Sequence, residues 1–268
     1  MSGRKYVHGY TEREAERLSD QGETLAGLLH DDTRYPAGSR VLEAGCGTGA
    51  QTVILARNSP DARITSVDIS QISLDAASKR VKAEGITNVT FEEGDIFDLH
   101  YGPGSFDHIF LCFVLEHLAE PRGALERLRP LLREGGTITV IEGDHGSAYF
   151  HPDSTHARRA IGCLVDLQRE MGGNALIGRE LYPLVAGAGY RDVYVSPRMV
   201  YADASRPDLA RGFTELTFTA MVEGVGDEAV NRGMMSREDW ERGIRDLYRT
   251  SRSDGVFCYT FFKATGRR

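Results

Sequence analysis

Short apolar segments alternate with longer amphipathic ones from residue 39 onward, and this alternation constrains the fold more than any other feature of the sequence. It is typical of βαβ units, which build a parallel sheet covered by helices. The pattern predicts strands at residues 40–44, 63–68, 88–92, 106–112, 137–142, 190–197 and 255–263. It predicts helices at residues 50–58, 70–84, 121–132, 154–170, 179–188, 207–221 and 237–250. The expected fold class is therefore α/β.

The same pattern divides the chain into a core and two additions. Residues 39–197 and 255–268 contain the predicted strands and form the expected core. Residues 198–254 separate the last two strands, whereas a hairpin loop needs only roughly 2–5 residues. We expect this insertion to be a helical cap over the substrate, and residues 1–38 to form an N-terminal helical lid.

Composition and charge exclude several classes of function. The 268 residues carry a formal net charge of -7, without a run of five or six like charges, so nucleic acid is not an expected partner. The longest apolar run, residues 109–115, is far shorter than the roughly 20 residues of a membrane span. The first 20 residues are charged and polar, unlike a secretory signal. We therefore expect a cytoplasmic protein without membrane association.

The cysteines give no sign of a disulfide framework or a zinc cluster. Cys46, Cys112, Cys163 and Cys258 lie far apart, and no Cys-x-x-Cys pair occurs. Isolated reduced thiols are the usual state of such cysteines in a cytosolic protein. The sequence thus predicts no metal site.

The segment VLEAGCGTG at residues 41–49 connects the first predicted strand to the first predicted helix. Its glycines permit a sharp turn and let a ligand approach the backbone closely. Asp68 ends the second predicted strand, where a carboxylate can bind ribose hydroxyls. The spacing G-x-G-x-G differs from the dinucleotide fingerprint G-x-G-x-x-G, and Glu43 would repel a pyrophosphate. We therefore expect a ligand that carries a positive charge and no pyrophosphate.

Four motifs together resemble a known enzyme family. They are EAGCGTG at 43–49, VDIS at 67–70, EGDI at 93–96 and FDHIFLCFVLEHL at 106–118. In order and spacing they are similar to the core of class I S-adenosylmethionine-dependent methyltransferases. The resemblance implies a Rossmann-like seven-stranded sheet in the order 3-2-1-4-5-7-6, with strand 7 antiparallel, and S-adenosylmethionine as the cofactor.

The resemblance also implies roles for residues around the glycine turn. The backbone of Gly45 and Gly47 would border the methionine part of the cofactor, and Glu43 would lie near its ammonium group. Asp68 would bind both ribose hydroxyls, and Ile69 would lie against the adenine.

Residues after the third and fourth strands complete the implied cofactor site. Asp95 would bind the adenine amino group, with Ile96 beside the ring. Cys112 would offer its backbone carbonyl to the cofactor, and Phe113 would lie near the reactive methyl group. The predicted lid adds Tyr6 and Gln21 as further cofactor-binding candidates.

Candidates for acceptor binding and catalysis follow from position. Ligands bind at the carboxyl ends of the strands in open α/β sheets, and a carbon, nitrogen or oxygen acceptor often needs a base. The catalytic candidates follow the fourth and fifth predicted strands: Glu116, His117, Glu142, Asp144 and His145. The tyrosines predicted to bind the acceptor are Tyr10, Tyr149, Tyr182 and Tyr201. Which polar residue acts as the base stays open.

Two closer resemblances concern the acceptor. The core is similar to the small-molecule C-methyltransferases of quinone biosynthesis. The whole chain, including YVHGY at 6–10 and EGDHGS at 142–147, is similar to bacterial methyltransferases that include indole C3-methyltransferases of natural-product pathways. The expected function is thus methyl transfer to a small molecule, with an electron-rich ring such as indole as one candidate.

Other functions and the assembly stay open at this point. The chain is alternatively an NAD(P)-dependent oxidoreductase, or a non-catalytic protein that binds S-adenosylmethionine. A protein is a further alternative as the methyl acceptor. The sequence predicts no oligomeric state.

Overall fold

The computed structural model describes residues 24–268. The predicted Tyr6, Tyr10 and Gln21 lie outside the described residues. The strands are β1 (Arg40–Ala44), β2 (Arg63–Asp68), β3 (Val89–Glu93), β4 (Phe106–Cys112), β5 (Leu132–His151), β6 (Arg191–Ala202) and β7 (Val256–Arg267). The α-helices are α2 (Ala50–Asn58), α3 (Gln71–Ala83), α4 (Pro121–Leu128), α5 (Thr155–Glu170), α6 (Leu181–Gly187), α7 (Pro207–Leu209), α8 (Ala220–Glu223), α9 (Gly226–Asn231) and α10 (Arg237–Arg249). Residues 24–30 are also helical.

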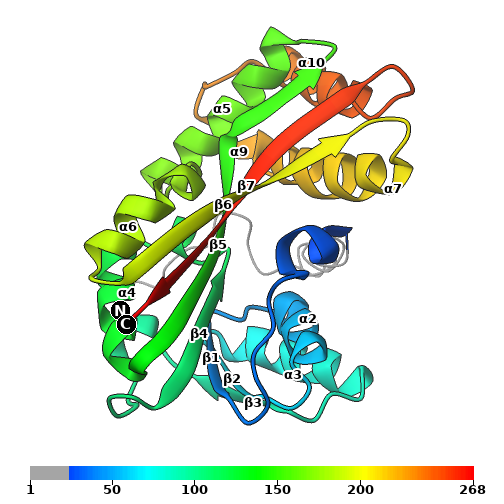
Figure 1. Cartoon of the computed structure of the whole chain (residues 1–268). Helices are drawn as coiled ribbons and strands as arrows, with labels where there is room; N and C mark the ends of the chain where they lie inside the picture. Colours follow the sequence, from blue (N-terminus) through cyan, green and yellow to red (C-terminus); the bar gives the residue numbers. More distant parts are fainter. Residues whose placement is uncertain (1–23) are drawn as a thin grey trace. The chain divides into compact units, whose positions relative to one another are not determined.

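The strands form one seven-stranded sheet in the order β3-β2-β1-β4-β5-β7-β6. Strands β3, β2, β1, β4 and β5 pair in parallel, with Leu42 of β1 opposite Thr65 of β2 and Ile109 of β4. The last strand, β7, runs in the opposite direction to β5 and β6 (Figure 1). The predicted fold class and strand order are therefore confirmed.

The chain forms two compact units, which we call unit 1 and unit 2. Unit 1 includes Gly143–Leu176 and Met199–Phe261. Unit 2 consists of Ala26–Glu142, Ile177–Arg198 and Phe262–Arg268. Residues 143–176 group with residues 199–261. The reason is that α5 packs against α10 through the apolar face of an amphipathic helix.

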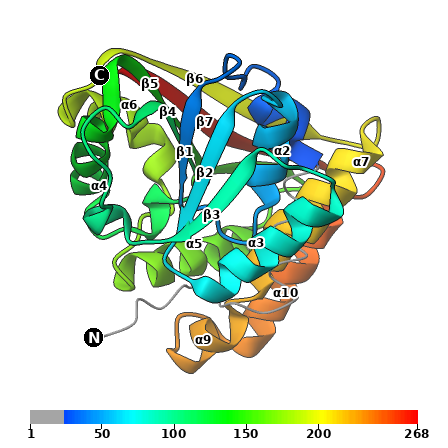
Figure 2. The same cartoon turned by 90° about the horizontal axis from the view of Figure 1, so that it is seen from below.

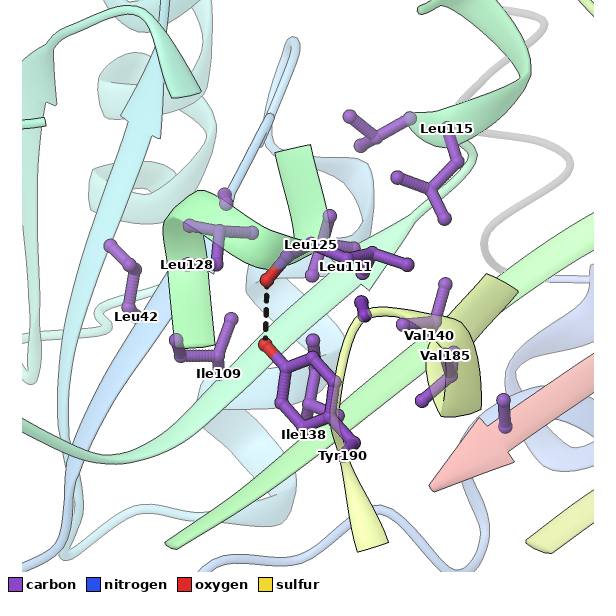
Figure 3. Packing of buried hydrophobic residues seen from close by; sticks show 14 of the residues in the cluster. Leu42, Ile109, Leu111, Leu115, Leu125, Leu128, Ile138, Val140, Val185 and Tyr190 are labelled. Carbon is purple, nitrogen blue, oxygen red and sulfur yellow. Dashed lines mark hydrogen bonds between the residues drawn. The ribbon is translucent and has the colours of Figure 1, made fainter. Parts of the chain in front are cut away.

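In unit 2, helices cover both faces of the parallel strands. Helices α2 and α3 lie on one face, and α4 and α6 lie on the other (Figure 1, Figure 2). Figure 3 shows Leu111, Val140 and Val185 packed together in the buried cluster beneath α4 and α6. The hydroxyl of Tyr190 donates to the carbonyl oxygen of Leu125 at 3.1 Å (Figure 3). Each such buried aliphatic side chain contributes about 1.5–3 kcal/mol, and together they hold the carboxyl ends of the strands in place.

In unit 1, aromatic side chains form the core. The rings of Phe213 and Phe218 come from a π-helix, η5 (Ala210–Thr219), which continues α7 into α8. They pack against Phe257, Tyr259 and Phe261 of β7, with ring centroids 4.9–6.1 Å apart. The predicted helix at 207–221 is thus present, but its central part is wound as a π-helix.

Three strands are longer than the sequence pattern predicts. Strand β5 continues to His151 instead of ending at residue 142, and β6 and β7 extend to Ala202 and Arg267. The expectation that Glu142, Asp144 and His145 follow the fifth strand is therefore wrong, because all three lie within it and are buried. The polar side chains of this part of β5 made the sequence resemble a loop. In the structure these side chains form hydrogen bonds inside the protein.

Among residues 24–268, no helix combines the length and the apolar character needed to cross a membrane.

Candidate functional site

The turn between β1 and α2 contains three glycines with positive φ, Gly45, Gly47 and Gly49, at 82°, 51° and 81°. A Cβ at Gly45 would lie 2.6 Å from Cγ2 of Val114, and one at Gly49 would lie 2.9 Å from Cβ of Ala77. At Gly47, no atom lies within 4 Å of the Cβ position. Internal packing thus explains the outer two glycines, whereas the middle one borders open space. This space is where a ligand can approach the backbone.

The carboxylate of Asp68 lies beside this turn. Its Oδ2 accepts a hydrogen bond from the backbone N–H of Gly47 at 2.8 Å. Its Oδ1 accepts one from the N–H of Ser70 at 2.9 Å. Each carboxylate oxygen has a second lone pair, so the group is oriented and can still accept further hydrogen bonds. A pair of neighbouring hydroxyl groups is a suitable donor for such a carboxylate.

The segment after β3 lies next to Asp68. The N–H of Gly94 donates to the carbonyl oxygen of Asp68 at 3.0 Å. Asp95 follows, and its Oδ1 accepts from the N–H of Phe97 at 2.9 Å at the start of the short helix η1 (Ile96–Asp98). Ile69 is 56% exposed, which leaves an apolar surface at the end of β2. Apolar and carboxylate groups thus occur together here, as a site for a flat heterocycle requires.

Glu43 lies inside unit 2. Its Oε2 accepts hydrogen bonds from the hydroxyls of Thr52 at 2.7 Å and Ser66 at 2.6 Å. Burial raises the pKa of this carboxyl group to about 7, although the two hydroxyl groups oppose the shift. Contact between Glu43 and a cofactor ammonium group stays a prediction.

The segment after β4 is held by a second buried carboxyl group. Oε1 of Glu142 accepts from the N–H groups of Val114 at 3.0 Å and Leu115 at 2.7 Å. Burial raises the pKa of Glu142 well above its usual value, and Glu116 raises it further. Phe113 adopts φ 58°, and its N–H donates to the carbonyl oxygen of Ile141. These bonds fix the backbone where Cys112 and Phe113 were predicted to meet the cofactor.

Two of the predicted catalytic residues are neighbours on the short helix η2 (Leu115–His117). Nε2 of His117 lies 3.6 Å from Oε1 of Glu116. Their side chains are 24% and 12% exposed, so water reaches both only in part. A carboxylate beside an imidazole is an arrangement that can hold or accept a proton.

Two further predicted catalytic residues, Asp144 and His145, belong to unit 1. Oδ1 of Asp144 accepts from the N–H of Gly146 at 3.0 Å. Nδ1 of His145 lies 2.7 Å from the hydroxyl oxygen of Tyr259. The sequence analysis missed Tyr259. A signal for it existed, because alternation along FCYTFF places Phe257, Tyr259 and Phe261 on one face of β7.

Three of the predicted acceptor-binding tyrosines lie among the described residues. Tyr149 and Tyr201 belong to unit 1 and are 49% and 42% exposed. The hydroxyl of Tyr149 lies 3.4 Å from Sδ of Met199. Tyr182 belongs to unit 2 and is exposed. The structure thus places two of these tyrosines in one unit and the third in the other.

Comparison with known proteins adds a family and several relatives. A family model described as a methyltransferase domain matches residues 36–186. The chain is 31% identical over 209 residues to an uncharacterised 37.1 kDa protein in transposon TN4556 of Streptomyces fradiae, covering 77% of this chain and 59% of that protein. It is 29% identical over 139 residues to the 27-O-demethylrifamycin SV methyltransferase of Amycolatopsis mediterranei, covering 52% of this chain and 51% of that one.

A solved structure shows a similar fold. Phosphoethanolamine N-methyltransferase 2 of Haemonchus contortus, in complex with S-adenosyl-L-methionine, matches with a TM-score of 0.54 and 18% sequence identity. The match covers 91% of this chain and 52% of that chain. The chain thus spans between half and three-fifths of the length of each protein named.

Proposed function

The chain belongs to the class I S-adenosylmethionine-dependent methyltransferases, and from this premise we propose that it transfers a methyl group to a small-molecule acceptor. S-adenosylmethionine is the cofactor, and when bound it supplies a methyl group made electrophilic by the sulfonium. The observation that carries the proposal is the turn at Gly47, whose open side lies beside the oriented carboxylate of Asp68.

The residues at the carboxyl ends of the strands fit this cofactor. The open space at Gly47 accommodates a close ligand, and Asp68 retains acceptor capacity for two ribose hydroxyls. In the proposal, Gly45 borders the methionine part together with Gly47. Glu43 would hold the ammonium group, and its pKa of about 7 would allow it to ionise when a cation is near.

The remaining residues of the proposed cofactor site follow β2, β3 and β4. Asp95 binds the adenine amino group, and the neighbouring apolar side chains hold the ring. Beyond β4, the backbone that Glu142 fixes lies toward the methionine part of the cofactor. The other residues that we propose for the cofactor site are Ile69, Ile96, Cys112 and Phe113.

For the acceptor we propose an electron-rich ring, such as an indole, in natural-product biosynthesis. The exposed Tyr149 and Tyr201 of unit 1 support this choice, because flat apolar rings stack on such side chains. In this proposal residues 198–254 act as the acceptor cap. Tyr182, in unit 2, is a further acceptor-binding candidate.

The protein's own contribution to the reaction is orientation and proton removal. Holding two reactants in line is worth about 7–11 kcal/mol of the barrier. The acceptor's proton passes to one of the ionisable residues near the strand ends. Glu142 is proposed to act mainly by fixing the backbone after β4, because its Oε1 is committed to two N–H groups. The other candidates for the base are Glu116, His117, Asp144 and His145.

We also propose a cytoplasmic location, since the four buried cysteines are free thiols, as a reducing compartment keeps them.

The function is tested by binding and by product release. Asp68→Asn should weaken the binding of S-adenosylhomocysteine about tenfold to a hundredfold in calorimetry, because hydrogen bonds to a charged group contribute about 1.5–3 kcal/mol. The exposed Asp61→Asn serves as the matched control and should bind normally. Screening indole, quinone and phenol libraries for S-adenosylhomocysteine release then identifies the acceptor.

Other results of these experiments would contradict the proposed function or the role of Asp68. Heat from a nicotinamide dinucleotide but none from S-adenosylhomocysteine would indicate an oxidoreductase. Binding of S-adenosylmethionine without product release from any acceptor, including protein extracts, would indicate a non-catalytic binding protein. Equal affinity of Asp68→Asn and wild type would remove Asp68 from the site.

A further inference from the structure

Residues 26–30 form the end of a helix that lies beside α2 (Figure 1). Nε2 of His30 lies 2.7 Å from Oε1 of Gln51, which is in the first turn of α2. Nδ2 of Asn58, the last residue of α2, donates to the backbone carbonyl oxygen of His30 at 2.8 Å. The spacing of Gln51, Leu55 and Asn58 places them on one face of α2. His30 is therefore bonded at both ends of that face.

The helix end that carries His30 is fixed by side chains from two strands. Nη1 of Arg198 on β6 donates to the carbonyl oxygen of Leu28, and Nζ of Lys263 on β7 donates to that of Leu29, both at 3.3 Å. The last carbonyl groups of a helix have no partner within it, and cations are favourable there. These residues, α2 and the glycine turn all belong to unit 2. The imidazole of His30 therefore has a defined place relative to the turn.

The imidazole of His30 is buried and uncharged at neutral pH. The residue is 1% exposed, and the centroids of its ring and the ring of Phe110 are 5.8 Å apart. Burial lowers the pKa of His30 to about 4, so only one ring nitrogen carries a proton at pH 7. Nδ1 is buried and has no hydrogen-bond partner in the described part of the chain. A buried N–H without an acceptor is costly, so we assign the proton to Nε2, which then donates to Oε1 of Gln51.

The bond from His30 orients the amide group of Gln51. Because Oε1 accepts from the imidazole, Nε2 of the amide keeps its two N–H donors for another group. No acceptor within residues 24–268 contacts this nitrogen. The first turn of α2 carries no acidic side chain, and the start of a helix favours an anion. The half-buried Gln51 thus presents donors where an anionic group is favourable.

We propose that His30 is a positioning residue of the cofactor site. It orients the amide of Gln51 so that the nitrogen, and not the oxygen, meets the carboxylate at the methionine end of the cofactor. The inference rests on the proposed function, in which Gly45 and Gly47 border the same part of the cofactor. Gln51 follows Gly49, the last glycine of this turn, by two residues. A reversed amide would present Oε1, which repels a carboxylate, so His30 favours ligands that carry a carboxylate at this end.

The first test compares two ligands that differ only in this carboxylate. They are S-adenosylhomocysteine and its decarboxylated analogue, and calorimetry measures both affinities. His30→Leu and Gln51→Ala should each weaken the binding of S-adenosylhomocysteine about tenfold or more, because a hydrogen bond to a charged group is lost. Both variants should bind the analogue nearly as the wild type does. His156→Leu, in α5 of unit 1, is the matched control and should bind both ligands normally.

The second test separates positioning from a structural role. His30→Gln places an N–H donor near the position of Nε2 and should restore most of the affinity lost in His30→Leu. Combining His30→Leu with Gln51→Ala should weaken binding no more than Gln51→Ala alone, because His30 acts through Gln51. An equal loss for both ligands in Gln51→Ala, unchanged affinities in Gln51→Ala, or additive losses in the double variant would each overturn the inference. Wild-type protein that binds neither ligand would instead contradict the proposed function.

Nitrogen-15 spectra of the imidazole, assigned with His30→Gln, give an independent readout that does not require His30→Leu to fold. We expect the proton on Nε2 in the wild type, both with and without S-adenosylhomocysteine. A proton on Nδ1 would overturn the assigned orientation of Gln51, because Nε2 of the imidazole would then accept from the amide.

Discussion

Two carboxyl groups flank the glycine turn, and their surroundings give them different properties. Glu43 is buried and bonded to two hydroxyl groups, whereas Asp68 is partly exposed and bonded to two backbone N–H groups. A buried carboxyl group favours its neutral form. The site thus combines a carboxyl group at Asp68 that the backbone orients with one at Glu43 whose charge depends on pH and on a bound cation.

The pKa of Glu43 predicts how stability depends on pH. Its folded value of about 7 exceeds its usual value of 4.5, so the folded state binds more protons between these values. The free energy of unfolding should therefore contain a contribution from Glu43 that is complete below pH 4.5 and is lost as the pH rises through 7. Urea unfolding of the ligand-free protein at pH 5 to 8 measures it.

Glu43→Gln removes this contribution while keeping the shape of the side chain. The difference in unfolding free energy between wild type and Glu43→Gln should shift in favour of the variant as pH rises. The exposed Glu134→Gln is the matched control and should follow the wild type. A difference between Glu43→Gln and wild type that stays constant from pH 5 to 8 would contradict the raised pKa.

At the scale of elements, the glycines in the turn between β1 and α2 have different roles. A side chain at Gly45 would displace Val114, while one at Gly47 would enter open space. Gly45→Ala should therefore lower Tm clearly. Gly47→Ala should cost only about 1–2 kcal/mol for its positive φ and weaken S-adenosylhomocysteine binding severalfold or more.

Thermal unfolding and calorimetry on the same two variants check this contrast. The control is Gly38→Ala, which has φ 77° and open space but lies before β1, away from the cofactor site. It should match Gly47→Ala in stability and the wild type in binding. Wild-type affinity in Gly47→Ala would remove the turn from the ligand site.

The sequence predicts some helices and strands better than others. Strands β1, β2 and β4 and helix α2 begin and end where predicted. At β1, β2 and α2, glycine, proline or a charged residue lies at or near the boundaries. The end of β5 was misplaced because Asp144 and His145 look like loop residues. In the structure His145 bonds to Tyr259, and Ser147 links Asp144 to Thr260. These partners follow more than a hundred residues later, so nothing next to residues 144–145 in the sequence indicates them.

The candidate site was predictable to a similar extent. The glycine turn and Asp68 form a local motif, and the structure brings them together by the bond between Gly47 and Asp68. The sequence indicated only part of the contact between His145 and Tyr259, because the pairing of β5 with β7 determines which side chains meet. Alternation indicated the face of β7 that carries Tyr259, but no spacing rule indicated its partner.

At the scale of the whole molecule, the chain divides into two units. The described residues that we propose for the cofactor lie in unit 2, and most of the proposed acceptor cap belongs to unit 1. Ligand binding stabilises the segments it contacts against local opening. Hydrogen exchange should therefore respond separately to each ligand.

S-adenosylhomocysteine should slow amide exchange at residues 45–49, 68–70 and 94–97 of unit 2. Residues 237–249 of α10 should exchange as in the free protein. Hydrogen–deuterium exchange with mass spectrometry measures both in one experiment, and Asp68→Asn at the same ligand concentration should abolish the effect. Protection confined to α10 would contradict the assignment of the cofactor to unit 2.

The contact between His145 and Tyr259 has an evolutionary consequence. Because the phenol of Tyr259 occupies the volume that a Cβ on Gly143 would fill, positions 143 and 259 cannot change independently. Descendants that acquire alanine or serine at 143 must shorten residue 259 or lose the contact with the imidazole. Covariation of these two positions across homologues would therefore record which lineages retain the pair and which have replaced it.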